Sequence, residues 1–140
     1  LNNDVITPNP DIVIFAMGHN DDGFSTASIT QEVRTVLART RAALPNLTKL
    51  IVAGPFFQGG SQATYIPVQD AIFEGARNFA DILIDTTSAP WFTGTGKVGA
   101  TTGSGNSDIF INTDGVHPTD AGHAFLASKM VSAVAPAFTS

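Results

Sequence analysis

The 140-residue sequence predicts a three-layer α/β/α fold built around a parallel sheet. Three short apolar runs, residues 12–17, 50–53 and 82–84, are continuous and not alternating, as expected of strands that are covered on both faces. Segments with apolar residues at helical spacing separate these runs. Because right-handed crossovers connect parallel strands, we expect helices on both faces of the sheet.

Three helices are predicted from the same periodicity. The first is expected over residues 28–44, with Ser28 and Gln31 forming a capping box at its start. The second is expected to begin close to Pro67, because proline is tolerated in the first helical turn but not in the interior. The third is expected over residues 120–134 with Thr119 as its N-cap. Residues 93–107, rich in Gly, Thr and Ser, indicate an exposed loop.

Composition narrows the functional classes. The hydrophobic content of 43% supports one globular domain over residues 1–140. A formal charge of -5, without any run of Lys or Arg, argues against nucleic acid as a partner. No apolar stretch is long enough to span a bilayer. The absence of Cys excludes disulfides and a thiol nucleophile, and the low Lys content favours an extracytoplasmic location over others.

The sequence GHND follows the first predicted strand directly. In open α/β sheets, ligands bind beyond the carboxyl ends of the strands, so polar residues at this point are candidates for chemistry. Gly18 permits a sharp turn, and the amide of Asn20 can donate hydrogen bonds to an oxyanion without adding charge. His19 is expected at the rim of the cleft, and Asp21 as a carboxylate that caps the loop backbone. The alternative is a polar turn without a catalytic role.

A second motif, DGVHP, precedes the last predicted helix. It places Asp114 three residues before His117, and a carboxylate that holds the Nδ1 proton of an imidazole leaves Nε2 free to act as a base. Gly115 permits the turn between them. The alternative is a helix-entry loop in which Asp114 forms an Asx turn and His117 lies on the surface.

Aromatic residues follow the second and third predicted strands. Phe56, Phe57 and Trp91 are candidates for the wall of a substrate pocket, although apolar residues at strand ends are also common in the core. His123, inside the last predicted helix, is interpreted as an ordinary helix-face residue.

Together the two motifs resemble those of the SGNH (GDSL-type) hydrolases. GHND matches the GxND block of that family, DGVHPTDAGH matches its DxxH block, and the resemblance covers essentially the whole chain. It implies a flavodoxin-like sheet and a serine ester hydrolase, an acyl or acetyl esterase or a lipase-like enzyme, that needs no cofactor. By the same resemblance Asn20 is the oxyanion-hole donor, Asp114 the orienting carboxylate and His117 the general base, while Gly18 shapes the loop.

The sequence departs from that family in one respect: it contains no Gly-Asp-Ser block. We therefore expect the chain to be the C-terminal part of an SGNH domain, without its first strands. The nucleophilic serine is expected on an N-terminal segment or a companion chain that pairs beside residues 12–17, so that this chain alone is inactive. The serines of the chain, Ser25, Ser28, Ser61 and Ser104 among them, lack the strand-end setting of a nucleophile.

Two alternatives remain open from the sequence. A metal-dependent phosphoesterase is suggested by the superficial likeness of GHND to the GNHD loop of those enzymes, but the order of residues differs and a two-metal site needs further ligands. Asp85 is the only additional carboxylate at a predicted strand end, so no metal ligand is assigned. The other alternative is a non-catalytic relative that binds carbohydrate or lipid on the same fold.

Overall fold

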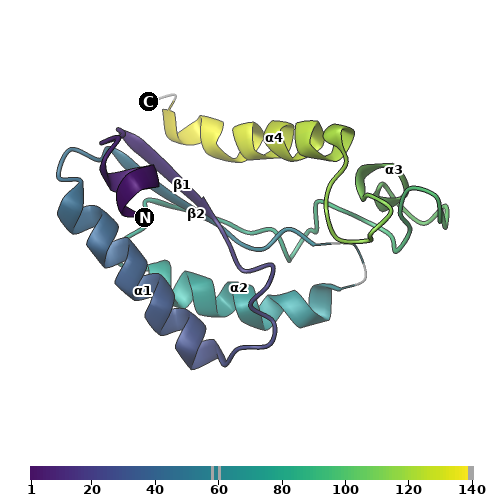
Figure 1. The fold of residues 1–140 in the computed structure, drawn as a ribbon, viewed down its shortest axis with the longest axis horizontal. Helices are drawn as coiled ribbons and strands as arrows, with labels where there is room; N and C mark the ends of the chain where they lie inside the picture. Colours follow the sequence, from purple (N-terminus) through teal and green to yellow (C-terminus); the bar gives the residue numbers. More distant parts are fainter. Residues whose placement is uncertain (58, 60, 139–140) are drawn as a thin grey trace. The chain divides into compact units, whose positions relative to one another are not determined.

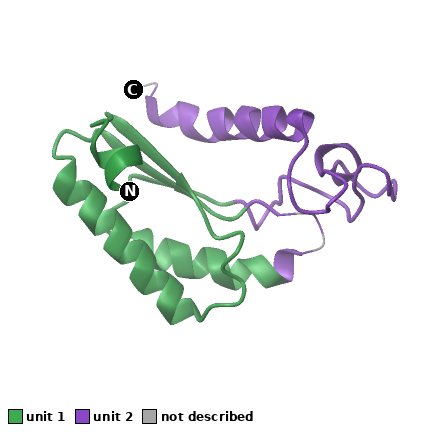
Figure 2. Ribbon diagram, in the orientation of Figure 1, with its two compact units in different colours: residues 1–55, 64–85 green, residues 56–63, 86–140 purple. Residues whose placement is uncertain are grey.

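The computed structural model describes residues 1–57, 59 and 61–138. They form two compact units (Figure 2). Unit 1 consists of Leu1–Pro55 and Thr64–Asp85, and unit 2 consists of Phe56–Ala63 and Thr86–Ser140. The organisation of residues 1–140 as one domain stays a prediction. No helix in the described ranges is both long enough and apolar enough to cross a membrane.

Unit 1 contains a parallel three-stranded sheet, which confirms the predicted strand direction. Its strands β1 (Ile12–Ala16), β2 (Lys49–Ala53) and β3 (Ile82–Ile84) follow one another in the order β1-β2-β3 (Figure 1). The central strand β2 is fully buried from Leu50 onward. In β1, by contrast, Ile12 and Ile14 are 43% and 45% exposed, so within this chain β1 is not covered on both faces as expected.

Two helices connect these strands and lie on the same side of the sheet (Figure 1). They are α1 (Thr26–Ala43) and α2 (Gln62–Ala76). Because the strand order advances in one direction, right-handed crossovers place both connecting helices on one face. Leu37 of α1 and Ile72 of α2 are fully buried and belong to the core of the unit. The third layer of the predicted fold therefore does not come from these two helices.

The predicted starts of α1 and α2 are both wrong. The N-cap of α1 is Ser25, whose side chain accepts a hydrogen bond from the Ser28 N–H at 3.2 Å, so Ser28 and Gln31 do not form the capping box. Helix α2 includes Pro67. Because Pro67 has no N–H, the carbonyl of residue 63 lacks its helical donor.

Beyond these elements, unit 1 begins with a short π-helix, η1 (Asn2–Ile6). Unit 2 contains α3 (Ser107–Phe110), α4 (Asp120–Val134) and a closing 3₁₀ turn, η2 (Ala135–Phe138). The bounds of α4 confirm the prediction, and Thr119 caps it by accepting a hydrogen bond from the Gly122 N–H at 3.0 Å.

The polar loop of unit 2 is more organised than its composition suggests. The Asn106 side chain accepts the Thr93 N–H at 2.7 Å, and the Asp108 carboxylate accepts the Gly103 N–H at 2.6 Å. An aromatic cluster supports it, since the ring of Phe110 lies 4.7 Å from Phe125 and 6.4 Å from Phe92 between centroids. Side-chain hydrogen bonds thus replace helix or sheet ladders along this segment.

Candidate active site

The GHND segment forms a tight turn directly after β1. The N–H of Asp21 donates to the carbonyl of Gly18 at 3.2 Å and closes the turn. Gly18 has φ +104°, and a Cβ at this position would lie 2.6 Å from Cδ1 of Ile72 and 3.1 Å from Cγ1 of Val68. Both the backbone conformation and the close approach to α2 therefore require glycine here.

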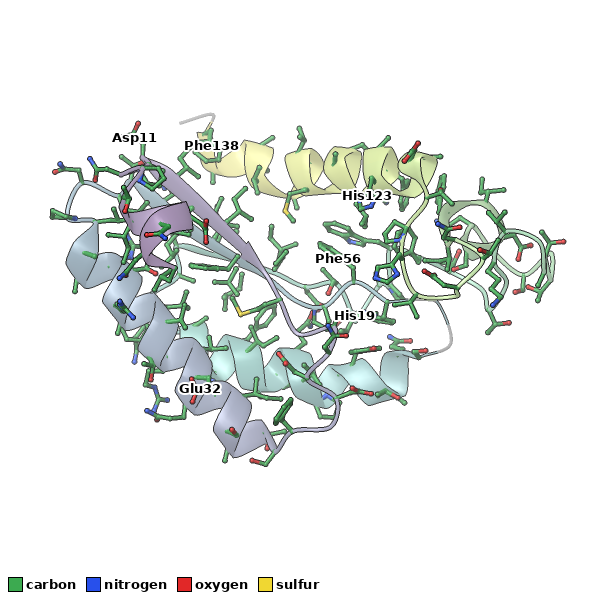
Figure 3. The ribbon with its side chains drawn as sticks, viewed as in Figure 1. Asp11, His19, Glu32, Phe56, His123 and Phe138 are labelled. Carbon is green, nitrogen blue, oxygen red and sulfur yellow. The ribbon has the colours of Figure 1, made fainter. Side chains whose placement is uncertain are left out.

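Tyr65 of α2 holds the same turn, and sequence reasoning missed it. Its hydroxyl donates to the carbonyl of His19 at 3.1 Å, and its ring stacks on the His19 ring with centroids 5.7 Å apart. Figure 3 shows His19 on the segment after β1. Burial, followed by the charge of Asp22, raises the pKa of the Tyr65 hydroxyl. The available signal was the spacing of Tyr65, Val68 and Ile72, which places the three on one helix face.

Asn20 occupies the exposed tip of this turn. Among the described residues, no hydrogen-bond partner of its side-chain amide is found. The Asp21 carboxylate is expected to cap the loop backbone. The main-chain carbonyl of Asp21 does so instead, because it accepts the Phe24 N–H at 3.0 Å.

The DGVHP segment brings Asp114 and His117 into direct contact. Nδ1 of His117 lies 2.7 Å from Oδ2 of Asp114. The other carboxylate oxygen, Oδ1, accepts the N–H groups of Val116 at 2.8 Å and His117 at 3.0 Å. Gly115, with φ +78°, supplies the left-handed turn that makes this compact loop possible. The Asx turn and the acid–imidazole contact, taken from the sequence as alternatives, thus occur together.

These contacts fix the charge of the acid and the place of the ring. The hydrogen bond from His117, followed by the N–H groups of Val116 and His117, holds the pKa of the Asp114 carboxyl well below its usual range. A main-chain bond from the Asn112 N–H to the His117 carbonyl, at 2.8 Å, closes the loop behind the ring. The His117 side chain is 75% exposed, so its remaining nitrogen, Nε2, is accessible.

The aromatic pocket candidates lie in unit 2. The rings of Phe56 and Trp91 are in contact, with centroids 5.3 Å apart, whereas Phe57 is only 4% exposed. Their contribution to a substrate pocket stays a prediction. His123 is exposed on α4, as expected for a helix-face residue.

A pocket of about 410 Å³ lies in unit 1, along α1. Its apolar wall and polar rim both come from α1 and from the segment that joins β1 to α1. The lining residues are Met17, Asp21, Phe24, Ser28, Ile29, Glu32, Val33 and Val36. We call this feature the α1 groove.

The parallel sheet with its connecting helices is that of an α/β fold (Figure 1). Residues 2–125 match the sequence model of the GDSL-like lipase/acylhydrolase family, and the chain belongs to this family. This membership favours an acylhydrolase over a metal-dependent phosphoesterase. No group of three or more His, Asp or Glu side chains that could hold a metal ion is found in the described ranges.

Individual relatives agree with this assignment. The chain is 25% identical over 128 residues to the GDSL lipase Rv0518 of Mycobacterium tuberculosis. These residues cover 89% of this chain and 50% of the relative. The acetylxylan esterase Axe2 of Geobacillus stearothermophilus superposes with a TM-score of 0.65 at 20% identity, covering 95% of this chain and 63% of that one. A lipase/acylhydrolase from Enterococcus faecalis gives 0.64 at 18% identity, with coverages of 96% and 66%.

The solved structures confirm the α/β fold that the sequence predicts. The chain spans about half the length of the curated relative and less than two thirds of these solved chains.

Proposed function

We propose that this chain supplies the oxyanion donor, the orienting acid and the general base of a serine ester hydrolase whose nucleophile lies on another segment. The observation that carries the proposal is the 2.7 Å contact between His117 Nδ1 and Asp114 Oδ2 in a member of an acylhydrolase family. A carboxylate in this position fixes the tautomer of the imidazole and stabilises its protonated form.

In the proposed reaction, Nε2 of His117 removes the proton from the serine hydroxyl as its oxygen attacks the ester carbonyl. The same proton then passes to the leaving alcohol, and an acyl-enzyme forms. Water repeats the sequence, with His117 as the base, and releases the acid. Asp114 remains ionised throughout, which is supported by the low pKa of its carboxyl.

Asn20 is proposed to stabilise the negative oxygen of the tetrahedral intermediates. Its amide has two N–H donors, and among the described residues none of the turn's hydrogen bonds uses them. A donor that is held in place before the reaction stabilises charge more effectively than water, which must reorient. The short turn from Gly18 to Asp21 provides that fixed position.

The nucleophile is proposed to lie on an N-terminal segment or a companion chain that adds a strand beside β1. No Gly-Asp-Ser sequence occurs among the 140 residues. In the described part of the chain β1 pairs only with β2, and its Ile12 and Ile14 residues are 43% and 45% exposed. One solved relative, a catalytic mutant of Axe2, replaces a serine near its own N-terminus by alanine. These points favour a serine outside the present sequence.

A serine-directed fluorophosphonate tests this arrangement in the complete protein. The reagent bonds covalently to an activated serine, so we expect the label on the segment that pairs with β1 and none on residues 1–140. Peptide mass spectrometry after digestion locates the label. A label on Ser25, Ser28, Ser61 or Ser104 would overturn the proposed division of the active site.

The role of His117 is tested by the rate of the same labelling. His117→Gln is expected to slow the reaction by at least about 10²-fold, because the serine loses its base. His123→Gln is the matched control, since it removes an exposed imidazole from α4 and should leave the rate unchanged. Equal rates for the two variants would exclude His117 as the base.

A further inference from the structure

We propose that Tyr65 is a positioning residue that fixes the direction of Asn20 by clamping the turn in which Asn20 lies. The inference rests on the oxyanion role proposed for Asn20. It concerns a residue that lies 45 positions further along the chain and that forms no part of either motif.

The clamp is built from one face of α2. Tyr65, Val68 and Ile72 are three and four residues apart, so their side chains point to the same side of the helix. Ile72 and Val68 contact the turn at Gly18, where no side chain fits between them and the backbone. Tyr65 holds the next residue, His19, through its hydroxyl and through its ring. Two successive residues of the turn are thus fixed by one rigid element.

The hydrogen bond to His19 acts directly on Asn20. The carbonyl of His19 and the N–H of Asn20 belong to the same planar peptide unit, so fixing that carbonyl also fixes where the Asn20 Cα lies. The turn's own closing bond, from the Asp21 N–H to the Gly18 carbonyl at 3.2 Å, uses neither polar group of the His19–Asn20 peptide. The Tyr65 hydroxyl adds a restraint on the plane of that peptide.

Asn20 needs such support because nothing else in the described residues holds its side chain. It is exposed, and no hydrogen bond from its amide is found there. An oxyanion donor that is misdirected by about 1 Å loses much of its effect. The position of its backbone therefore decides where the amide points.

Tyr65→Phe removes the hydroxyl and keeps the ring that stacks on His19. In the complete hydrolase we expect kcat on a simple acyl ester to fall about 3- to 10-fold, with KM changed less than about 2-fold, because the bond supports transition-state binding only. The matched control is Thr48→Val. Thr48 also donates a side-chain hydroxyl to a main-chain carbonyl of unit 1, that of Asp11 at 2.8 Å, at the opposite end of β1 from the turn. Its kcat should equal that of the parent protein.

A double-mutant cycle separates positioning from general destabilisation. If Tyr65 acts through Asn20, then Tyr65→Phe lowers kcat in the parent and has no effect on the residual kcat of Asn20→Ala. If Tyr65→Phe lowered kcat by the same factor in the parent protein and in Asn20→Ala, or left kcat of the parent unchanged, the inference would be overturned. Neither result would affect the role of Asn20. An Asn20→Ala variant with full kcat would instead overturn the proposed function.

The clamp also has a readout that does not depend on hydrolysis. In the complete protein, the carbonyl ¹³C resonance of His19 is expected to shift on Tyr65→Phe, because that carbonyl loses its hydrogen-bond donor. Thr48→Val should leave the resonance in place. An unchanged His19 resonance in Tyr65→Phe would show that the hydroxyl does not hold the turn, whatever the kinetics.

Discussion

Asn20 and His117 are held by different means. His117 is bound through its side chain, since the Asp114 carboxylate contacts both its ring and its main-chain N–H. In the described part of the chain, Asn20 is held through the backbone on either side of it. Substitution at these two positions should therefore have different consequences for the surrounding loops.

Asn20→Ala is expected to lower kcat on a simple acyl ester by about 10²–10³-fold, the loss that follows removal of one oxyanion donor. Because the exposed side chain supports no described hydrogen bond of the fold, the unfolding temperature should stay the same. Steady-state kinetics and thermal unfolding of the complete protein measure the two quantities. Asn78→Ala, in the exposed turn after α2, is the matched control. An unchanged kcat would remove Asn20 from the mechanism.

At the scale of single residues, the sequence predicted contacts that are local in the chain. The need for glycine at position 18, the Thr119 cap and the Asp114–His117 contact all involve residues within a few positions of one another, or a backbone requirement. Tyr65 escaped prediction because its partner, His19, is 46 positions away. A helical stripe identifies a buried face, but it does not indicate which loop that face meets.

At the scale of elements, Asp81 joins three parts of unit 1. One of its carboxylate oxygens, Oδ2, accepts the Leu50 N–H of β2 at 2.6 Å and the Arg41 guanidinium of α1 at 2.5 Å, just before β3 begins. Burial by itself raises the pKa of Asp81, but the Leu50 N–H, the Arg41 guanidinium and the charge of Lys49 outweigh it. The pKa of this carboxyl is therefore lower than usual.

Asp81→Asn is expected to lower the free energy of unfolding by about 1 kcal/mol at pH 7, a modest value because the pair is partly exposed. A lowered folded-state pKa contributes stability that is present above the unfolded-state pKa of about 4 and lost as the pH falls through the folded-state value. The difference between parent and variant should therefore shrink towards pH 2. Urea unfolding at pH 7 and at low pH measures it.

Glu74→Gln provides the comparison for this prediction. Glu74 pairs with Arg77 on the surface of α2, where both side chains are more exposed than Asp81 and Arg41. Its effect on stability should be smaller at both pH values. A difference for Asp81→Asn that grows as the pH falls would contradict the sign derived above.

Helix and strand identities were predictable from periodicity, whereas helix starts were not. Ser25 and Ser28 are both acceptable caps by residue type, and only the geometry of the chain after Phe24 selects Ser25. The sequence predicts that α2 begins close to Pro67, because proline is disfavoured in a helix interior. In the structure Pro67 is accommodated inside α2. Helix starts of this kind depend on the backbone path of the loop that precedes the helix.

At the scale of the whole molecule, the edge of β1 that is unpaired in the described chain and the α1 groove both belong to unit 1. All lining residues of the groove come from α1 and the segment between β1 and α1. If a strand that precedes β1 in the chain pairs with this edge, the order of strands continues in one direction. Its right-handed crossover helix would then lie on the face that carries α1, beside the groove.

Val36→Glu tests whether this segment occupies the groove. A carboxylate placed in the apolar wall would be buried without a partner, so docking of the serine-bearing segment should weaken by about 10-fold or more. In the complete protein this should appear as faster proteolytic cleavage within that segment and slower fluorophosphonate labelling. Gln31→Glu adds the same charge at an exposed position of α1 outside the groove and should change neither. Equal behaviour of the two variants would exclude the groove as the docking surface.

The division of the chain into two units also restricts how it can be taken apart. The boundaries at residues 55, 63 and 85 mean that the backbone passes from one unit to the other three times. Neither unit is a continuous stretch of sequence, and no single cut separates the residues of one from those of the other. A gene truncated anywhere between residues 56 and 84 therefore encodes a piece of both units and the whole of neither.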